Sequence, residues 1–200
     1  MRYLPAAHMG SPGSNGTIYR IVIHATVSAC RRGQAWATAQ YFARSTAGGS
    51  AHWTTDPSEI VQSVPEDRYA WHAPPNSHSL GMELCDPMVY PGTNRELPAS
   101  RWQDADHQPM LQLAAGHLRQ VADRHRIPLR WLTIGEVAAG GRGFCTHDDV
   151  SKAFRQSSHW DPGVGFPKAQ FMSYITGGTP PPPTGPVAHD DTLDLLGYTL

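Results

Sequence analysis

The chain has 200 residues, which is enough for one domain of ordinary size and a short tail. Its 16 basic residues nearly balance 17 acidic ones, so a net charge of −1 gives no reason to expect attraction to nucleic acid or to an anionic membrane. No stretch approaches the length of a membrane span, and residues 1–16 lack the basic start and apolar run of a signal peptide. We therefore expect a protein made in the cytoplasm that neither binds nucleic acid nor inserts into a membrane.

Histidine is the compositional outlier, with 11 copies, which directs attention to metal sites. The three cysteines, Cys30, Cys85 and Cys145, lie far apart and form no CxxC pair, so a zinc ribbon and a thioredoxin-like motif are excluded. We expect them to be buried or partly buried free thiols, although one pair could oxidise outside the cell.

The first half of the chain predicts several strands and one helix. Residues 1–17 are expected to be an N-terminal extension, and the apolar run from Ile18 to Ile23 predicts a buried central strand that ends at His24. Apolar residues at helical spacing predict a helix over residues 34–46, which Gly48 and Gly49 would stop. Four further strands, expected to pair with the first, are predicted at residues 50–55, 60–65, 69–72 and 80–85.

The second half predicts helices that flank this sheet. Residues 101–126 carry apolar side chains at helical spacing and should cover one face, and residues 167–175 form a last amphipathic segment. The fold class is therefore α/β, with a mixed central sheet, and the catalytic domain should span residues 18–178. The sequence TPPPPTGP at 179–186 favours an extended linker, and residues 187–200 are either a tail or the start of a further module.

A possible zinc site can be assembled from distant residues. Zinc hydrolases hold the ion with three protein ligands and leave a position for water. His24 lies at a predicted strand end, and His147 and Asp161 lie in a region rich in Gly and Pro, so folding would have to bring the three together. Spacing alone does not distinguish such ligands from ordinary hydrogen-bonded histidines.

Six separated motifs carry a family resemblance. They are IVIHAT (21–26), SAHW (50–53), VPEDRYAWHA (64–73), SLGMEL (79–84), THDDV (146–150) and WDPG (160–163). In this order the set resembles the zinc N-acetylmuramoyl-L-alanine amidases related to peptidoglycan recognition proteins, which include many phage endolysins. The resemblance covers about residues 18–175, and it implies the fold of that family.

The resemblance also implies roles for individual residues. His24, His147 and Asp161 match the three zinc ligands, the last of which is cysteine in some members. Glu83 matches the glutamate that acts on the water molecule at the zinc. On a strand, a glutamate could otherwise simply face solvent. Beside zinc its carboxylate would accept a proton from water and pass it to the departing amine.

Two positions depart from the family pattern. His159 stands where many relatives have a lysine that stabilises charge on the attacked carbonyl, and a protonated or hydrogen-bonding histidine could do the same. Ala51 stands where some phage members have a catalytic tyrosine, so the glutamate-using variant is the closer match. Cys145 is not at a ligand position of the family and is interpreted as structural.

Three further residues are candidates for substrate binding. Trp71 and His72 fall in a segment that borders the substrate cleft in the family, although Trp71 would suit the core equally well. His52 is open to the same two interpretations.

The implied activity is zinc-dependent hydrolysis of the amide bond between N-acetylmuramic acid and L-alanine in bacterial peptidoglycan. The Pro-rich segment favours a phage endolysin that reaches the cell wall through a holin, and we expect this enzyme to be a monomer. A cytoplasmic enzyme that recycles muropeptides, a peptidoglycan-binding module without catalysis and a metal-free structural domain are the alternatives.

Overall fold

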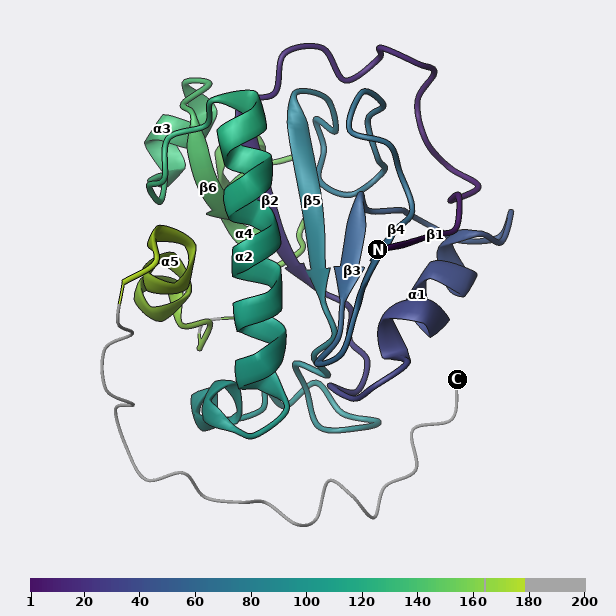
Figure 1. Cartoon of the computed structure of the whole chain (residues 1–200), viewed down its shortest axis with the longest axis vertical. Coiled ribbons are helices and arrows are strands. Elements are labelled where there is room, and N and C mark those ends of the chain that lie inside the picture. Colours follow the sequence, from purple (N-terminus) through teal and green to yellow (C-terminus); the bar gives the residue numbers. More distant parts are fainter. Residues whose placement is uncertain (164, 179–200) are drawn as a thin grey trace.

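The computed structural model describes residues 1–163 and 165–178 (Figure 1), so the predicted linker and tail at 179–200 lie outside the described residues. Its centre is a six-stranded sheet of order β1-β4-β3-β5-β2-β6. The strands are β1 (Arg2–Tyr3), β2 (Arg20–Ala25), β3 (Trp53–Thr55), β4 (Ile60–Gln62), β5 (Ser79–Leu84) and β6 (Gly143–Thr146). β3 and β4 are antiparallel and the other neighbours are parallel, which confirms the predicted mixed sheet.

Side-chain alternation along β2 divides the molecule into two faces. Ile21 and Ile23 belong to the large core cluster, together with the buried side of α2 (His107–His125), whereas Val22 belongs to a smaller cluster. His24 shares the face of Val22, opposite α2. Figure 1 shows α2 lying across the sheet with α5 (Lys168–Thr176) beside it.

The long helix predicted over residues 101–126 is present but interrupted. A 3-10 turn, η1 (Ala99–Gln103), precedes α2, and the break lies at Asp104. The Asp104 carboxylate accepts hydrogen bonds from the backbone N–H groups of Asp106 (3.0 Å) and His107 (2.8 Å), so it caps a new helix start. Within the described residues, no helix is both long and apolar enough to span a bilayer.

The face opposite α2 carries elements that the sequence patterns did not predict. α3 (Ile134–Ala138) and α4 (His147–Phe154) pack there beside Val22 and the buried Cys145. Thr146 and Asp149 form a capping box at the start of α4. His147 is therefore held at the first position of a helix that directly follows β6.

Two predicted elements require correction. The helix predicted over 34–46 is shorter than expected, because α1 (Gln34–Phe42) ends at Phe42 and not at residue 46. The strand predicted at 69–72 was wrong, because only Ala70 forms an isolated bridge, to Met9. The N–H groups of His72 and Ala73 both donate to the Asn76 side chain, at 3.0 and 2.9 Å, and these bonds hold the segment as a loop.

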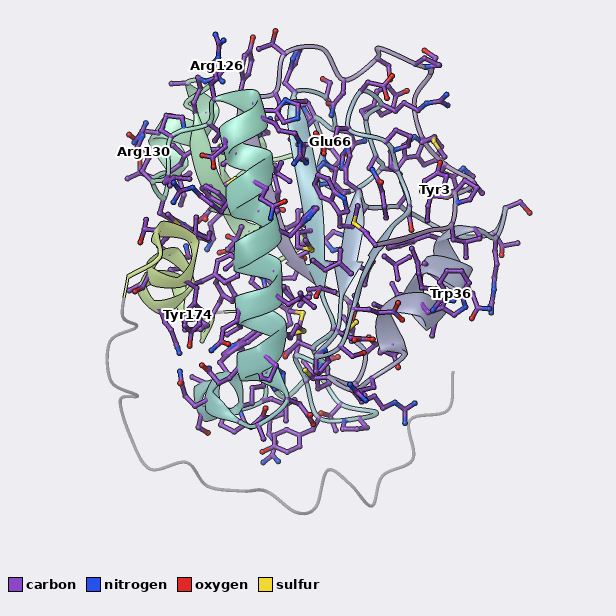
Figure 2. All side chains as sticks on the ribbon, viewed as in Figure 1. Tyr3, Trp36, Glu66, Arg126, Arg130 and Tyr174 are labelled. Atoms are coloured by element: carbon purple, nitrogen blue, oxygen red, sulfur yellow. The ribbon has the colours of Figure 1, made fainter. Side chains whose placement is uncertain are left out.

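The N-terminal segment adds an edge strand to the sheet. β1 pairs with β4, and the Arg2 guanidinium lies 3.5 Å from the ring centroid of Trp36 on α1 while it pairs with Glu59 at 3.2 Å. Figure 2 shows Tyr3 and Trp36 at this edge of the molecule and Tyr174 of α5 at the opposite one. Residues expected to be an extension are therefore packed against the sheet.

Candidate metal centre

A groove of about 930 Å³ opens on the face of the sheet opposite α2. Its floor contains His24 from β2 and Glu83 from β5, which are direct neighbours in the parallel register of these strands. One wall comes from α1 and the loop that follows it, and another from the loop that contains Ser157 to Asp161. The groove thus joins segments from both halves of the chain.

His24, His147 and Asp161 meet at this floor, as expected from the sequence. One oxygen of Asp161 lies 3.1 Å from Nδ1 of His24 and the other lies 3.1 Å from Nδ1 of His147. One potential ligand atom from each residue lies within 4.8 Å of the other two, and all three residues are buried. Two imidazole nitrogens and a carboxylate oxygen converging in this way fit the donor set of a zinc site.

The electrostatics of the cluster favour ligand forms that bind a cation. Burial lowers the pKa of His24 despite its contact with Asp161, so the ring is neutral. Burial alone would raise the pKa of Asp161, but the close approach of the His147, His159 and His24 rings outweighs it and holds that pKa well below its usual value. A neutral imidazole and an ionised carboxylate are the protonation states in which these groups bind metals.

Glu83 lies beside this cluster but outside it. Its Oε2 atom is enclosed and has no hydrogen-bond partner. Burial raises the pKa of Glu83 well above its usual value, and the negative charge of Asp161 raises it further. A carboxyl group with a raised pKa and a free oxygen in a groove is suited to accepting and returning a proton.

His159 covers the cluster from the solvent side. Its ring stacks on that of His147 with centroids 4.6 Å apart, and its Nδ1 atom lies 3.7 Å from Asp161. The nearby Asp161 carboxylate raises the pKa of His159. The side chain is 68% exposed and lines the groove, so it can reach a bound molecule.

The three candidate substrate residues occupy different places. Trp71 is 46% exposed and lines the groove, so it is not a core residue. His72 is buried at the floor and contacts His24. His52 is fully buried, away from the groove lining, with Nδ1 accepting from Gly81 N and Nε2 donating to Arg68 O, and burial lowers its pKa to about 4.

The structure adds groove residues that the sequence analysis did not assign. Trp160 is 43% exposed on the groove wall, and it lies inside the WDPG motif, where only Asp161 received a role. Ser157 Oγ lies 3.3 Å from Nε2 of His147, on the side of the ring away from Asp161. No pattern in the sequence points to this serine. Cys145 is a buried free thiol outside the cluster, and burial raises its pKa to about 12.

A comparison with known families matches the part of the chain that carries the sheet and the cluster. The family model described as N-acetylmuramoyl-L-alanine amidase matches residues 14–164. This range contains β2 to β6 and all three members of the cluster. The chain therefore belongs to the N-acetylmuramoyl-L-alanine amidase family, as the motif series implied.

Individual relatives are more distant. A segment of 89 residues is 30% identical to the N-acetylmuramoyl-L-alanine amidase XlyA of Bacillus subtilis (strain 168) and covers 42% of this chain but only 30% of XlyA. The hydrolase AmiA of Staphylococcus aureus has a similar structure, with a TM-score of 0.62 at 16% identity over 87% of this chain and 80% of that one. The structure of the amidase LysC of Clostridium intestinale URNW is also similar, with a TM-score of 0.55 at 14% identity over 90% of this chain and 99% of that one. These structural similarities confirm the predicted fold.

Proposed function

We propose that the chain is a zinc-dependent amidase that hydrolyses the bond between N-acetylmuramic acid and L-alanine in peptidoglycan. His24, His147 and Asp161 would hold the metal. The observation that carries the proposal is the position of Glu83, which is the cross-strand neighbour of His24 and keeps an unpaired carboxyl oxygen beside the ligand cluster. Membership of the amidase family supports the choice of bond.

The proposed chemistry assigns proton transfer to Glu83. A zinc ion held by these residues would supply Lewis acidity, which polarises the amide carbonyl and lowers the pKa of water. Glu83 accepts a proton as water attacks the carbonyl carbon and then donates it to the amide nitrogen as the carbon–nitrogen bond breaks. The products are the lactyl carboxylate on the sugar and a stem peptide with a free L-alanine amine.

His159 is proposed to stabilise negative charge on the carbonyl oxygen. Its exposure toward the groove and its stacking on His147 support this role, because the ring is oriented by its neighbours yet accessible to a ligand. Trp71 and Trp160 are proposed to contact the apolar faces of the substrate, since both present exposed aromatic surface along the groove.

Digestion of purified peptidoglycan with the zinc-loaded protein tests this assignment. Mass spectrometry should detect free stem peptides that begin with L-alanine, and a His147→Ala variant should release none. Cleavage of glycosidic or peptide–peptide bonds would overturn the proposed bond. Zinc and cell-wall binding without any product would replace the enzyme with a binding module.

For the biological role we propose a monomeric phage or prophage endolysin, with residues 18–178 as catalytic domain and residues 179–186 as linker. The similarity of this chain to the structure of a mutant endolysin from Bacillus subtilis supports this choice (TM-score 0.55, 21% identity, 87% of this chain and 96% of that one). Release through a holin would bring such an enzyme to the wall. Rates on intact sacculi and on soluble muropeptides should differ in favour of sacculi, and the reverse preference would indicate a recycling enzyme.

A further inference from the structure

We propose that His72 is a positioning residue that fixes the orientation and the tautomer of His24, and so presents the Nδ1 atom of His24 to the metal. The Nε2 atom of His24 lies 2.9 Å from Nδ1 of His72. The Nε2 atom of His72 lies 3.0 Å from Oγ of Ser79. The proposal rests on the proposed role of His24 as a metal ligand, and it assigns His72 to the support of that ligand instead of to substrate contact.

The direction of the hydrogen bonds follows from the far end of this chain of contacts. Ser79 Oγ donates its single hydrogen to the carbonyl oxygen of Asn76, at 3.0 Å. It can therefore only accept from His72, so the hydrogen of the His72 ring is on Nε2 and the lone pair is on Nδ1. This lone pair requires that His24 carries its own hydrogen on Nε2.

The consequence appears at the other nitrogen of His24. With its hydrogen on Nε2, His24 turns an unprotonated Nδ1 toward the Asp161 oxygen 3.1 Å away. Two electron-pair donors at this distance repel each other unless a cation lies between them. The hydrogen-bond chain that starts at Asn76 therefore selects the form of His24 that is ready to bind a metal.

The surrounding structure holds His72 in place for this role. The ring occupies the space above Gly81, where a side-chain Cβ would lie only 2.7 Å from Nδ1 of His72. Ser79 is 1% exposed, and its backbone carbonyl accepts a hydrogen bond from the Asn15 side chain at 2.9 Å. His72, Ser79 and Gly81 thus form one rigid support beneath His24.

Two substitutions of His72 separate this role from a general effect on folding. In His72→Asn, the side-chain oxygen takes the position of Nδ1 and can still accept from His24. In His72→Gln, the side-chain amide reaches toward Ser79 but leaves no acceptor at the position of Nδ1. His52→Asn is the matched control, because His52 is a buried histidine that packs edge to face on His72, with ring centroids 5.7 Å apart, without contacting a proposed ligand.

The measurement is zinc affinity by competition with a chromogenic chelator, with circular dichroism to compare the folded fraction. We expect His72→Gln and His72→Ala to weaken zinc binding by about 10–100-fold, the range typical of lost partners of metal ligands, and His72→Asn and His52→Asn to stay near the wild-type affinity. In zinc-loaded protein, nitrogen chemical shifts should report the hydrogen of His72 on Nε2.

Equal zinc affinity of wild type and His72→Gln, or equal losses in His72→Gln and His72→Asn, would overturn the proposed positioning role while leaving the amidase proposal intact. A hydrogen on Nδ1 of His72 in the loaded protein would do the same. A wild-type protein that binds no zinc would overturn the metal centre and this role together.

Discussion

Replacing Glu83 with glutamine tests the proton-transfer role with little change of shape. The Oε2 atom of Glu83 has no hydrogen-bond partner, so an amide of the same shape breaks no hydrogen bond at this atom. The uncharged amide should therefore change the free energy of unfolding by less than the ~1 kcal/mol typical of point substitutions. Loss of general acid–base catalysis should lower kcat by about 10²–10⁴-fold.

The assay is the initial rate at which peptidoglycan releases new L-alanine amines, together with zinc affinity and urea unfolding of the same samples. Glu59→Gln is the matched control, because Glu59 pairs with Arg2 on the surface and lies outside the groove lining. A Glu83→Gln rate within tenfold of wild type would refute the reasoning, since tenfold is below the smallest contribution expected of an acid–base group. Loss of zinc affinity would instead make Glu83 part of the metal centre.

Three further outcomes are expected. Zinc at 100 times its dissociation constant should stabilise the folded protein by about 2.7 kcal/mol. Removing zinc with a chelator should therefore lower Tm, and an unchanged Tm would contradict a metal site in the folded state. Burial alone would lower the pKa of His107, but a hydrogen bond to Asp104 (2.8 Å) and the Asp86 carboxylate (3.6 Å) raise it well above its usual value. This folded-state pKa exceeds the unfolded value of about 6.5, so the wild-type protein should be more stable than His107→Gln by the full amount below about pH 6.5. The difference in free energy of unfolding should decline as pH rises through the folded pKa. Urea unfolding that shows the same difference at every pH would contradict this expectation. Trp160→Ala should raise KM while kcat changes little, whereas the exposed Leu113 of α2 serves as a control whose replacement by alanine should change neither.

The sequence predicted those parts of the fold that depend on periodic patterns. The apolar run before His24 predicted β2, and helical spacing predicted α2 and α1, because these elements bury a continuous strand or one helix face. The segment at 69–72 has strand-like composition, yet its backbone bonds to Asn76 and forms a loop. Hydrogen bonds from a side chain several residues away do not appear in a pattern of apolar residues.

The sequence likewise predicted some residues of the candidate site but not the roles of others. The motif resemblance brought out His24, His147, Asp161 and Glu83, and the structure gathers all four at one groove. The resemblance could not distinguish the role of His72 from that of His52, since both are buried histidines beside aromatic residues. Only the three-dimensional contacts distinguish a ring bonded to His24 from one bonded to backbone atoms alone.

The register of β2 and β5 connects stability with the site. Ile21 and Ile23 alternate with Val22 and His24, and on β5 Leu80 and Met82 alternate with Gly81 and Glu83. A slip of one residue in either strand would turn its polar side chain into the core under α2, which would be strongly unfavourable. The apolar residues that hold the α2 face together therefore also fix His24 and Glu83 as neighbours on the opposite face. Substitutions in that core are expected to alter the distance between these two groups even where they never touch the groove.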